Sequence, residues 1–342
     1  MNLPSVTVLI AARPGQAEVK AATASRALDY PADKLEVIVA RGRQPSAQRN
    51  AALKAARGEL IYFLDDDSVP GSGNLRRAVP HFNDPAVKMA GGPNLCPPDA
   101  PELEQVFAAV LASWLAFGPS RARYTPVGAL RETTEKELIL CNLVSRREAL
   151  VQLGGFNEAL YPNEENALMD ELQKRGGKLI YDPQFFVHRR PRSSLKAFAR
   201  MLLTYGRGRA EQFRLHPTLG SALNFIPPLF CVYLLFLLPA LIWRWLPAAI
   251  LLAPLAVYAL ALLGQGLALC ARRESRLATF ETNQPGRQRT PLRQIFESVA
   301  AMPLIILTHV LYGLGFWRGL FTKLEPFSEA SSAPVTLETL VH

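Results

Sequence analysis

The sequence predicts an α/β domain followed by an α-helical membrane region. Over the first half of the chain, short apolar runs alternate with helical patterns, which indicates a sheet with parallel strands. Apolar residues make up 49% of the 342 residues, and most of this excess lies after Ala222. Residues 188–215, just before the first long apolar segment, contain eight Lys or Arg and one Glu. Such a basic stretch is typical of the cytoplasmic flank of a membrane segment.

The α/β pattern can be followed element by element. Strands are predicted at residues 6–11, 35–40, 59–64, 86–90, 138–140 and 185–187, and helices at residues 16–28, 46–56, 75–82, 101–117 and 163–175. Ser46 is the expected N-cap of the second helix. Residues 118–136 are irregular, basic and interrupted by Pro and Gly, so we expect a mobile loop over a site. No signal peptide precedes the first strand, so this domain is expected in the cytoplasm.

Charge and cysteine usage exclude two classes of protein. The net charge of +9 is concentrated next to the membrane segments, which favours a lipid surface over nucleic acid. The cysteines show no paired spacing, and two of them lie in apolar runs, so we expect reduced thiols without a disulfide or zinc framework. They are Cys96, Cys141, Cys231 and Cys270.

Three consecutive carboxylates, Asp65, Asp66 and Asp67, follow the strand predicted at residues 59–64. Ligands of an open parallel sheet bind beyond the carboxyl ends of its strands, so these acids are expected to face a binding crevice. Neighbouring carboxylates repel one another unless a cation lies between them. Oxygen ligands suit Mg²⁺ or Mn²⁺, which commonly bridge the phosphates of a nucleotide. The alternative is a solvated acidic turn or a helix cap at Asp67 or Ser68.

A second acidic pair, Glu164-Glu165, begins the helix predicted at residues 163–175. A carboxylate in the first turn of a helix is stabilised in its ionised form by the helix dipole. The pair is therefore either a functional acid site or simple compensation of that dipole.

The membrane region contains two clear spans and a weaker third. Residues 225–243 and 246–269 are each long enough to cross a bilayer, with Arg244 and Trp245 at the tight turn between them. Residues 299–316 are interrupted by His309 and two glycines, and form either a third span, a re-entrant segment or a surface for a partner. Six arginines are expected in a cytoplasmic loop between the second and third segments: Arg272, Arg273, Arg276, Arg287, Arg289 and Arg293.

An amphipathic helix is predicted at residues 193–214, before the first span. Leu195, Phe198, Leu202 and Tyr205 share one of its faces, and basic residues occupy the others. This pattern favours an interfacial helix on anionic lipid, with a core-facing soluble helix as the alternative.

The order of several short motifs resembles that of the family 2 glycosyltransferases, which have the GT-A fold. The motifs are Gln48-Arg49-Asn50, Gly58-Glu59-Leu60, Asp65-x-Asp67, Gly154-Gly155-Phe156-Asn157-Glu158 and Glu164-Glu165, followed by a basic helix. Each motif alone is weak, but their order and spacing are specific over residues 4–215. The apolar tail resembles that of bacterial members that assemble polysaccharides.

The resemblance implies a GT-A mixed-sheet domain with a metal, Mn²⁺ or Mg²⁺, on the donor side of the site. Asp65 would contact the ribose side of a nucleotide-sugar donor and share the metal with Asp67. The other candidates for donor binding are Ala11, Arg13, Arg49 and Asp66. For Arg49 the alternative is an ordinary charge on a helix surface. His188 is a further candidate metal ligand, with a hydrogen-bonded structural histidine as its alternative.

Glu165 matches the general base implied by the family, although a Glu in place of the usual Asp leaves the choice between Glu164 and Glu165 open. One base that deprotonates the acceptor hydroxyl suffices for an inverting transfer, because the metal offsets the charge of the leaving diphosphate. On the acceptor side, the candidates are Asn142, or else an ordinary turn Asn, and Arg207 and Arg209, which either bind a lipid phosphate or contact head groups only.

Two departures from the family pattern concern the donor. No acid follows the second strand, where Arg41-Gly42-Arg43 stands in place of a base-reading Asp, and no Glu follows the first strand. The donor nucleotide is therefore left open among UDP, GDP and dTDP. The Gln-x-x-Arg-Trp signature of processive synthases is also absent, so we expect single-sugar addition.

We thus expect a cytoplasmic GT-A catalytic domain at residues 1–190, a basic interfacial helix and linker at 191–221, two to three transmembrane helices at 222–322 and a tail at 323–342. The expected protein is a multi-pass enzyme of the inner membrane that moves a sugar from a nucleotide donor to a lipid-linked polyprenyl acceptor. A polyprenyl-phosphate sugar synthase is the alternative within the class. A non-catalytic membrane scaffold with a degenerate GT-A domain is the alternative outside it.

Overall fold

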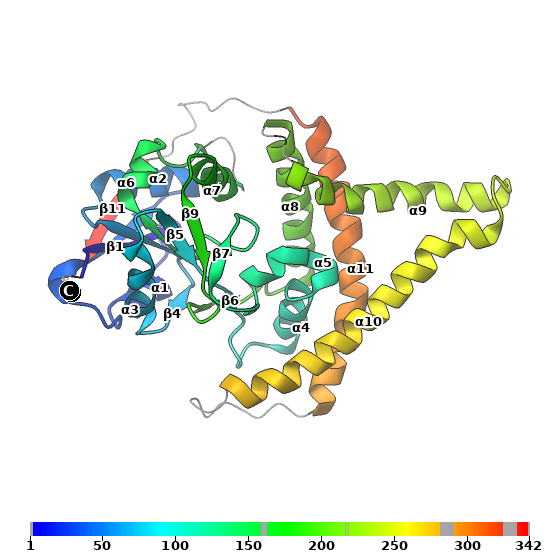
Figure 1. The fold of residues 1–342 in the computed structure, drawn as a ribbon, viewed down its shortest axis with the longest axis horizontal. Helices are drawn as coiled ribbons and strands as arrows, with labels where there is room; N and C mark the ends of the chain where they lie inside the picture. Colours follow the sequence, from blue (N-terminus) through cyan, green and yellow to red (C-terminus); the bar gives the residue numbers. More distant parts are fainter. Residues whose placement is uncertain are drawn as a thin grey trace. The chain divides into compact units, whose positions relative to one another are not determined.

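The computed structural model describes residues 3–158, 163–215, 217, 219–280, 291–323 and 334–340. The chain divides into two compact units. The first unit comprises Met1–Leu95, Ala122–Arg190 and Glu325–His342, and the second comprises Cys96–Arg121 and Pro191–Leu324. The elements of both units are labelled in Figure 1. The domain boundaries expected at residues 190 and 221 stay a prediction.

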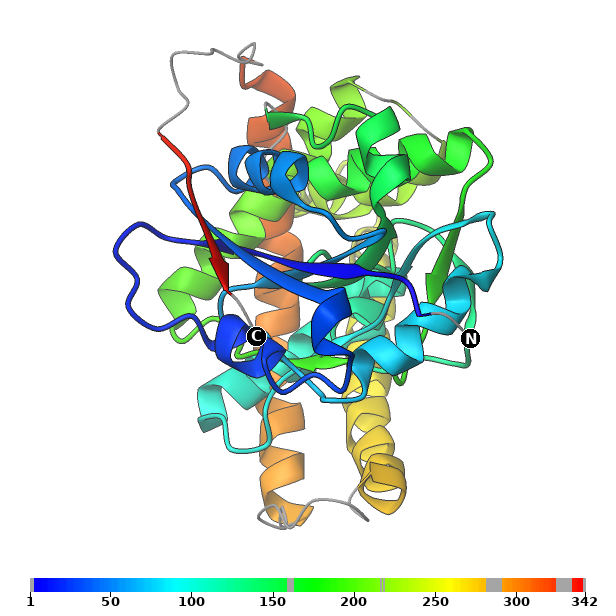
Figure 2. The same ribbon diagram turned by 90° about the vertical axis from the view of Figure 1, so that its left-hand side faces the viewer.

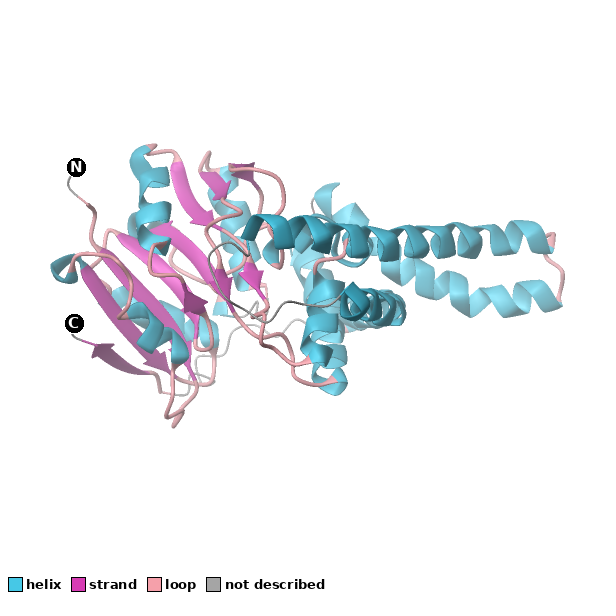
Figure 3. Ribbon diagram, turned by 90° about the horizontal axis from the view of Figure 1, so that it is seen from below, coloured by secondary structure: helices cyan, strands magenta, loops and turns pink. Residues whose placement is uncertain are grey.

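The first unit is built on a mixed sheet (Figure 3), for which the described residues supply eight strands in the order β11-β2-β1-β3-β8-β5-β9-β7. These strands are β1 (Val6–Ala12), β2 (Leu35–Arg41), β3 (Leu60–Asp65), β5 (Val87–Gly91), β7 (Arg131–Thr133), β8 (Asn142–Arg146), β9 (Lys178–Tyr181) and β11 (Thr336–Leu340). Strands β1, β2 and β3 are parallel, whereas β8 runs antiparallel to β3. A smaller sheet joins β4 (Val69–Pro70), β10 (Val187–His188) and β6 (Asn94–Leu95).

Helices cover both faces of the larger sheet because its central strands are apolar on both sides. Val8 and Ile10 of β1 belong to one buried cluster with α1 (Lys20–Ser25) and α3 (Asn74–Ala78). Leu9 belongs to a second buried cluster on the opposite face. That cluster includes side chains of α2 (Pro45–Ala55), α6 (Arg147–Gln152) and α7 (Glu164–Lys174). The result is a three-layer α/β unit whose parallel strands point their carboxyl ends to one edge.

Strand β11 extends this sheet from near the end of the chain. Thr336–Leu340 pairs antiparallel with β2, and Figure 2 shows it, in red, beside the blue strand β2. Glu338 of β11 forms an ion pair with Arg41 at the carboxyl end of β2, at 3.2 Å. This strand was expected to be part of a tail.

The parallel strands and most helices were predicted, but several local predictions were wrong. Of the strand predicted at residues 185–187, only Val187 belongs to β10 (Val187–His188). Ser46 does not cap α2, because Gln44 is the N-cap and its side chain accepts a hydrogen bond from the backbone N–H of Ala47. Pro45 then takes the first helical position, where its missing N–H has no cost. No strand forms at residues 138–140, since β8 begins only at Asn142. The helix expected at residues 101–117 is divided into α4 (Glu102–Leu111) and α5 (Trp114–Phe117).

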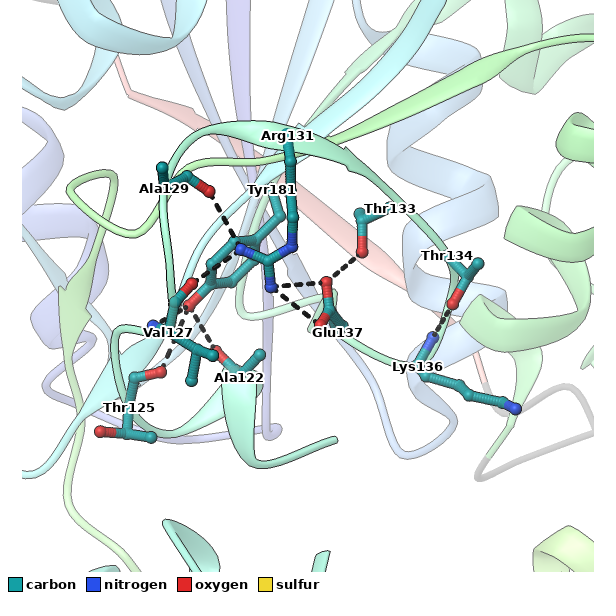
Figure 4. Close-up of polar contacts among 10 residues, drawn as sticks. All are labelled: Ala122, Thr125, Val127, Ala129, Arg131, Thr133, Thr134, Lys136, Glu137 and Tyr181. Atoms are coloured by element: carbon teal, nitrogen blue, oxygen red, sulfur yellow. Dashed lines mark hydrogen bonds and ion pairs between the residues drawn. The ribbon is translucent and has the colours of Figure 1, made fainter. Parts of the chain in front are cut away.

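Residues 118–136 were expected to be an irregular, mobile loop, but they include a 3-10 helix (Gly118–Arg123) and strand β7. The part from residue 122 to residue 137 is internally braced (Figure 4). The guanidinium of Arg131 lies over the ring of Tyr181, 4.5 Å from its centroid, and forms two bonds of 2.8 and 2.9 Å to Glu137. It also donates to the carbonyl oxygen of Val127, and the Tyr181 hydroxyl bonds to the carbonyl oxygens of Ala122 and Thr125. The mobility of this loop stays a prediction.

In the second unit, three described helices are long and apolar enough to cross a membrane, over Ala222–Ile242, Ala248–Ala271 and Ile295–Phe321. The first begins in a short 3-10 helix (Leu219–Phe225) and continues as α9 (Ile226–Ile242), and the others lie in α10 (Ala248–Phe280) and α11 (Pro291–Phe321). Arg244, between the first two, has a left-handed φ of 50°, as a tight turn requires. The third segment is one continuous helix, and its His309 is satisfied by bonds to the Tyr258 hydroxyl and the Leu115 carbonyl.

The six arginines expected in one loop are distributed differently. Because α10 continues to Phe280, Arg272, Arg273 and Arg276 lie on that helix, and Arg293 lies on α11. Arg287 and Arg289 lie outside the described residues.

Helix α8 (Leu195–Leu215) packs on protein along the face that was expected to meet lipid. Phe198 is fully buried and stacks on Phe107 of α4, with ring centroids 4.3 Å apart. Gly206 lies so close to the Tyr312 carbonyl of α11 that any Cβ would collide with it. Figure 1 shows α8 and α11 side by side in this unit. The amphipathic pattern therefore reflects helix packing, and contact of the basic residues with lipid stays a prediction.

Candidate functional site

The carboxylates that follow β3 are neutralised by two arginines. Asp65, the last residue of β3, accepts from Arg49 at 3.3 Å and from Arg189 at 3.0 Å. Arg189 also bonds through Nε to Oδ1 of Asp67 at 2.6 Å. The alternative of a purely solvated acidic turn is therefore wrong, because side chains from two other elements compensate the clustered negative charge.

Arg189 is the residue that the sequence analysis missed. It directly follows β10, which pairs with β4 and β6, and its backbone N–H donates to the Leu95 carbonyl at 2.9 Å. Burial disfavours its charged form, but the charges of Asp65 and Asp67 hold the pKa of Arg189 well above its usual value. It had been counted with the basic membrane flank. The available signal was its position beside His188, at the end of a predicted strand.

Arg49 connects the two acidic motifs. Its guanidinium contacts Asp65 through Nη2 and Oε1 of Glu164 through Nη1, the latter at 2.9 Å. Only 9% of its side chain is exposed, and Phe156 lies beneath the guanidinium at 6.0 Å. The alternative of a helix-surface charge is thus wrong. The end of β3 and the first turn of α7 are brought together through this one residue.

The neighbours of Arg49 fix its helix to the surrounding strands and turn. Gln48 donates to the carbonyl oxygens of Ala12 and Ala40, at the carboxyl ends of β1 and β2, at 2.8 and 2.6 Å. Asn50 exchanges two bonds with the backbone of Phe156, at 2.8 and 2.9 Å. The Gln48-Arg49-Asn50 motif therefore connects the carboxyl ends of β1 and β2 with the Gly-Gly-Phe turn.

That turn needs glycine at residue 155. Gly155 has a φ of +84°, and a Cβ on it would collide with Oδ1 of Asn50. Asn50 also donates to Glu158 at 2.8 Å. Glycine at residue 155 thus serves the tight turn itself, because its backbone conformation and its contact with Asn50 both exclude a side chain.

Glu164 and Glu165 lie in different environments although they are adjacent. Glu164 is only 2% exposed, and its Oε2 has no hydrogen-bond partner among the residues that the structure describes. Burial and the charge of Glu165 raise the pKa of Glu164 to about 7, against the opposing effect of Arg49. Glu165 is partly exposed in the same first turn of α7. The pair thus offers one accessible carboxylate and one that titrates near neutral pH.

The acids after β3 fit a divalent cation by their chemistry. Asp65 and Asp67 are oxygen ligands, and Mg²⁺ is usually held by one or two carboxylates together with phosphate oxygens and waters. Asp67 is 44% exposed and uses only Oδ1 for Arg189, so Oδ2 remains for a metal. Among the described residues, no three His, Cys, Asp or Glu side chains form a metal-holding group. A metal here would therefore depend on ligands from the substrate, and the metal role of His188 stays a prediction.

The remaining candidates of this unit are placed as follows. Ala11 pairs with Asp65 in the sheet, and Arg13 is exposed just beyond β1. Asp66 accepts a bond from the Ala21 N–H through its backbone carbonyl. Asn142 is fully buried, accepts from the Tyr62 hydroxyl at 2.9 Å and donates to the Phe185 carbonyl at 2.7 Å. Its amide therefore has a structural part, and its acceptor role stays a prediction.

Arg207 and Arg209 lie on α8, in the second unit. Arg207 pairs with Glu211 one turn later at 3.3 Å, and Arg209 donates to Gln212 at 3.0 Å. Both contacts run along the helix. Their role toward a lipid phosphate stays a prediction.

Several proteins of known class are similar to this chain. The mannosyltransferase PcManGT of Pyrobaculum calidifontis, solved with GDP-Man and Mn²⁺, has a TM-score of 0.47 and 21% identity, over 89% of this chain and 88% of that one. Staphylococcus aureus TarS has a TM-score of 0.42 and 13% identity, over 67% of this chain and 43% of that one.

The sequence is also similar to a glycosyltransferase from another organism and to a family profile. The pre-mycofactocin glycosyltransferase of two Mycobacterium tuberculosis strains is 28% identical over 173 residues, which are 51% of this chain and 36% of that protein. The chain thus matches about a third of the length of these curated relatives. A sequence profile described as "Glycosyltransferase like family 2" matches residues 2–203, which is more than half of the chain.

Proposed function

This chain belongs to glycosyltransferase family 2, and on that premise we propose that it is a membrane-anchored, metal-dependent inverting glycosyltransferase. It moves a single sugar from a nucleotide-sugar donor to a lipid-linked acceptor in polysaccharide or glycan assembly. The observation that carries the proposal is the double contact of Arg49. Because Arg49 bonds to both Asp65 and Glu164, the acids of the donor side and the glutamate pair that contains the candidate general base belong to one site.

The donor side is assigned to the carboxyl ends of β1 and β3. Asp65 and Asp67 would hold Mn²⁺ or Mg²⁺, and a metal bound there would offset the charge of the departing diphosphate. Ala11, Arg13 and Asp66 border the donor. Arg49 keeps Asp65 in place through its 3.3 Å contact.

Glu165 is assigned as the general base. It is the more exposed member of the acidic pair, and a base must be able to reach the acceptor hydroxyl. Glu165 takes the proton of that hydroxyl as its oxygen attacks the anomeric carbon, and the bond to the diphosphate oxygen breaks on the opposite face. Glu164 acts through Arg49, because its carboxylate holds the guanidinium that contacts Asp65.

The acceptor is assigned to the membrane. The three apolar helices would anchor the enzyme in the cytoplasmic membrane, with the catalytic domain at residues 1–190 in the cytoplasm. A polyprenyl carrier keeps its phosphate at the membrane surface, where Arg207 and Arg209 of α8 would bind it. Residues 191–221 would form the basic segment of this arrangement and 222–322 the membrane region, whereas strand β11 within 323–342 pairs with β2 in the sheet of the first unit.

The test is nucleotide release from UDP-, GDP- and dTDP-sugars by the purified full chain with Mn²⁺ or Mg²⁺ and a bacterial lipid extract. We expect turnover with one nucleotide class and a sugar-bearing lipid product of inverted anomeric configuration. Asp67→Asn should abolish turnover, and Glu165→Gln should lower kcat by about 10² to 10⁴ with little change in the donor KM. Gln152→Ala is a matched control, because Gln152 is exposed and, among the residues that the structure describes, bonds to Glu148 within its own helix.

The outcomes separate the assignments. If Glu164→Gln loses kcat while Glu165→Gln does not, the base is Glu164. A monophosphate product on the lipid would favour the polyprenyl-phosphate sugar synthase. Failure to bind any nucleotide or metal would contradict the proposal and favour a non-catalytic scaffold.

A further inference from the structure

Arg189 occupies the place between two carboxylates that a cation would otherwise take. Its Nη1 lies 3.0 Å from Oδ2 of Asp65 and its Nε lies 2.6 Å from Oδ1 of Asp67. One guanidinium thus joins the two acids that the proposed function assigns to a metal. Arginine is charged at any working pH, so the pairing persists wherever the carboxylates are ionised.

Of the two carboxylates that Arg189 contacts, Asp67 is the one that can exchange the guanidinium for another cation. Asp65 keeps a second arginine, Arg49, on its other oxygen, so its charge stays compensated when Arg189 leaves. For Asp67 the described structure gives Arg189 as its ion-pair partner, and 44% of that side chain is exposed to solvent. A cation arriving from solvent would therefore compete with Arg189 chiefly for Asp67.

The guanidinium of Arg189 could bind a phosphate group at this position in place of a carboxylate. Its planar fork matches the geometry of phosphate as well as that of carboxylate. The Arg189 backbone is held by the bond of its N–H to the Leu95 carbonyl, so only its side chain needs to turn. That side chain is 22% exposed, beside the carboxyl end of β3 where an open sheet binds its ligands.

We propose that Arg189 is an exchangeable counter-ion of the Asp65 and Asp67 pair. It holds both carboxylates in the donor-free protein and, when a donor arrives, yields Asp67 to a divalent cation and binds the diphosphate of that donor. The last step rests on the proposed function, whereas the competition for Asp67 does not. Arg189 is therefore a donor-binding residue that also suppresses metal binding until a donor arrives.

The test measures metal and nucleotide binding separately, on the full chain in detergent without any acceptor. Free Mn²⁺ is titrated by electron paramagnetic resonance, first without nucleotide. Arg189→Gln should bind Mn²⁺ at least about tenfold more tightly than the wild type, since the competing charge-assisted bond is gone. With Mn²⁺ saturating, the same variant should bind UDP and GDP at least about tenfold more weakly.

Two further variants keep the test decisive. Arg189→Lys retains the charge but not the fork, so its Mn²⁺ affinity should lie between those of the wild type and Arg189→Gln. It also serves if Arg189→Gln does not fold. Arg175→Gln is the matched control, since Arg175 forms an exposed 3.0 Å pair with Glu171 on α7 and should leave both affinities unchanged.

An unchanged or weaker Mn²⁺ affinity in both Arg189 variants would overturn the proposal. Tighter Mn²⁺ binding with unchanged nucleotide binding would also overturn it, because the diphosphate step would be absent. These results do not depend on turnover. A wild type that transfers sugar while its variants show no metal effect would leave the proposed function intact and remove this inference alone.

Discussion

Two carboxylates of the first unit, Glu164 and Asp182, are almost equally buried but have opposite pKa shifts. Asp182 is inaccessible to solvent and accepts from Arg77, His81 and the backbone N–H of Gln184. These bonds outweigh the effect of its burial and lower the pKa of Asp182 to about 2. Glu164 has one arginine, an unpartnered oxygen and a like charge beside it, and its pKa is raised to about 7.

The difference shows that burial alone does not decide the state of an acid; the number of donors around it does. Asp182 is ionised throughout the useful pH range and contributes to stability. Glu164 is poised between its two states near neutral pH. Strong perturbation of this kind, beside other acids and at the end of a sheet, is typical of functional sites.

Removing a hydrogen-bond donor from Asp182 is expected to have the largest effect on stability. Arg77→Met leaves a buried carboxylate without its main partner, and this should cost about 3 kcal/mol in the free energy of unfolding at neutral pH. The measurement is the melting temperature of the full chain in detergent. Arg76→Met is the matched control, because the pair that the adjacent Arg76 forms with Asp29 is exposed to solvent. Equal losses in the two variants would contradict the reading of Asp182.

The stability that Glu164 contributes should change with pH in the opposite direction to that of Asp182, and Glu164→Gln tests this. The raised pKa of Glu164 means that its contribution is fully present below its unfolded value of 4.5 and is lost as pH rises through about 7. This loss is on the order of 3 kcal/mol, and glutamine does not share it. The variant should therefore gain on the wild type in melting temperature between about pH 5 and about pH 8. Parallel melting curves across that range would show that Glu164 does not titrate there.

The stability that Asp182 contributes should be lost in acid rather than near neutral pH. Its lowered pKa means that its contribution is present above the unfolded value of 3.8 and is lost as pH falls through about 2. Asp182→Asn should therefore be less stable than the wild type by about 2 kcal/mol at neutral pH, and should approach it in strong acid. Comparing their melting temperatures at neutral and acid pH is the measurement. A constant difference would show that lost packing, rather than lost charge, is responsible.

A smaller effect is expected at the turn that supports Arg49. Gly155→Ala places a Cβ against Asn50 in a backbone with positive φ, and should cost about 1–3 kcal/mol and lower turnover. Gly176→Ala separates the two causes, since Gly176 has a φ of +80° with no atom within 4 Å of its would-be Cβ. It should cost about 1 kcal/mol and leave turnover unchanged. Equal effects on turnover would mean that the contact with Asn50 does not matter.

Strand β11 gives the smallest expected effect. Glu338→Gln removes an ion pair with Arg41 whose side chains are 50% and 24% exposed, so the loss should be about 0–1 kcal/mol. Unfolding at low and high salt measures it. A loss that is large and insensitive to salt would contradict the description of this pair as a surface contact.

The parts of the fold that could be predicted are those whose pattern lies within a short stretch of the sequence. The apolar runs of β1, β2 and β3, and the acids that follow β3, are each visible within a few residues. Arg189 could not be assigned, because its partners are more than 120 residues away and its neighbours in sequence are also basic. Glu165 and Glu164 were left undivided, since only packing shows that Glu164 is the buried one.

The second unit shows the same limit in another form. The amphipathic face of α8 was visible, but the same pattern suits lipid and protein. Its burial on α4 and α11 depends on glycines that allow close backbone approach, such as Gly206, and these cannot be paired from sequence alone. Strand β11 was missed because it has little apolar alternation, and its place depends on the free edge of β2.

We infer that Arg49 joins both acidic motifs into one site, and that this site works only when Glu164 is ionised. The most direct measurement is the pH dependence of donor-dependent nucleotide release by the wild type and by Glu164→Gln. In the wild type, we predict that the rate rises with pH through an apparent pKa of about 7, because ionised Glu164 holds Arg49 against Asp65. In Glu164→Gln this limb should be absent. The same limb in both proteins would contradict the account.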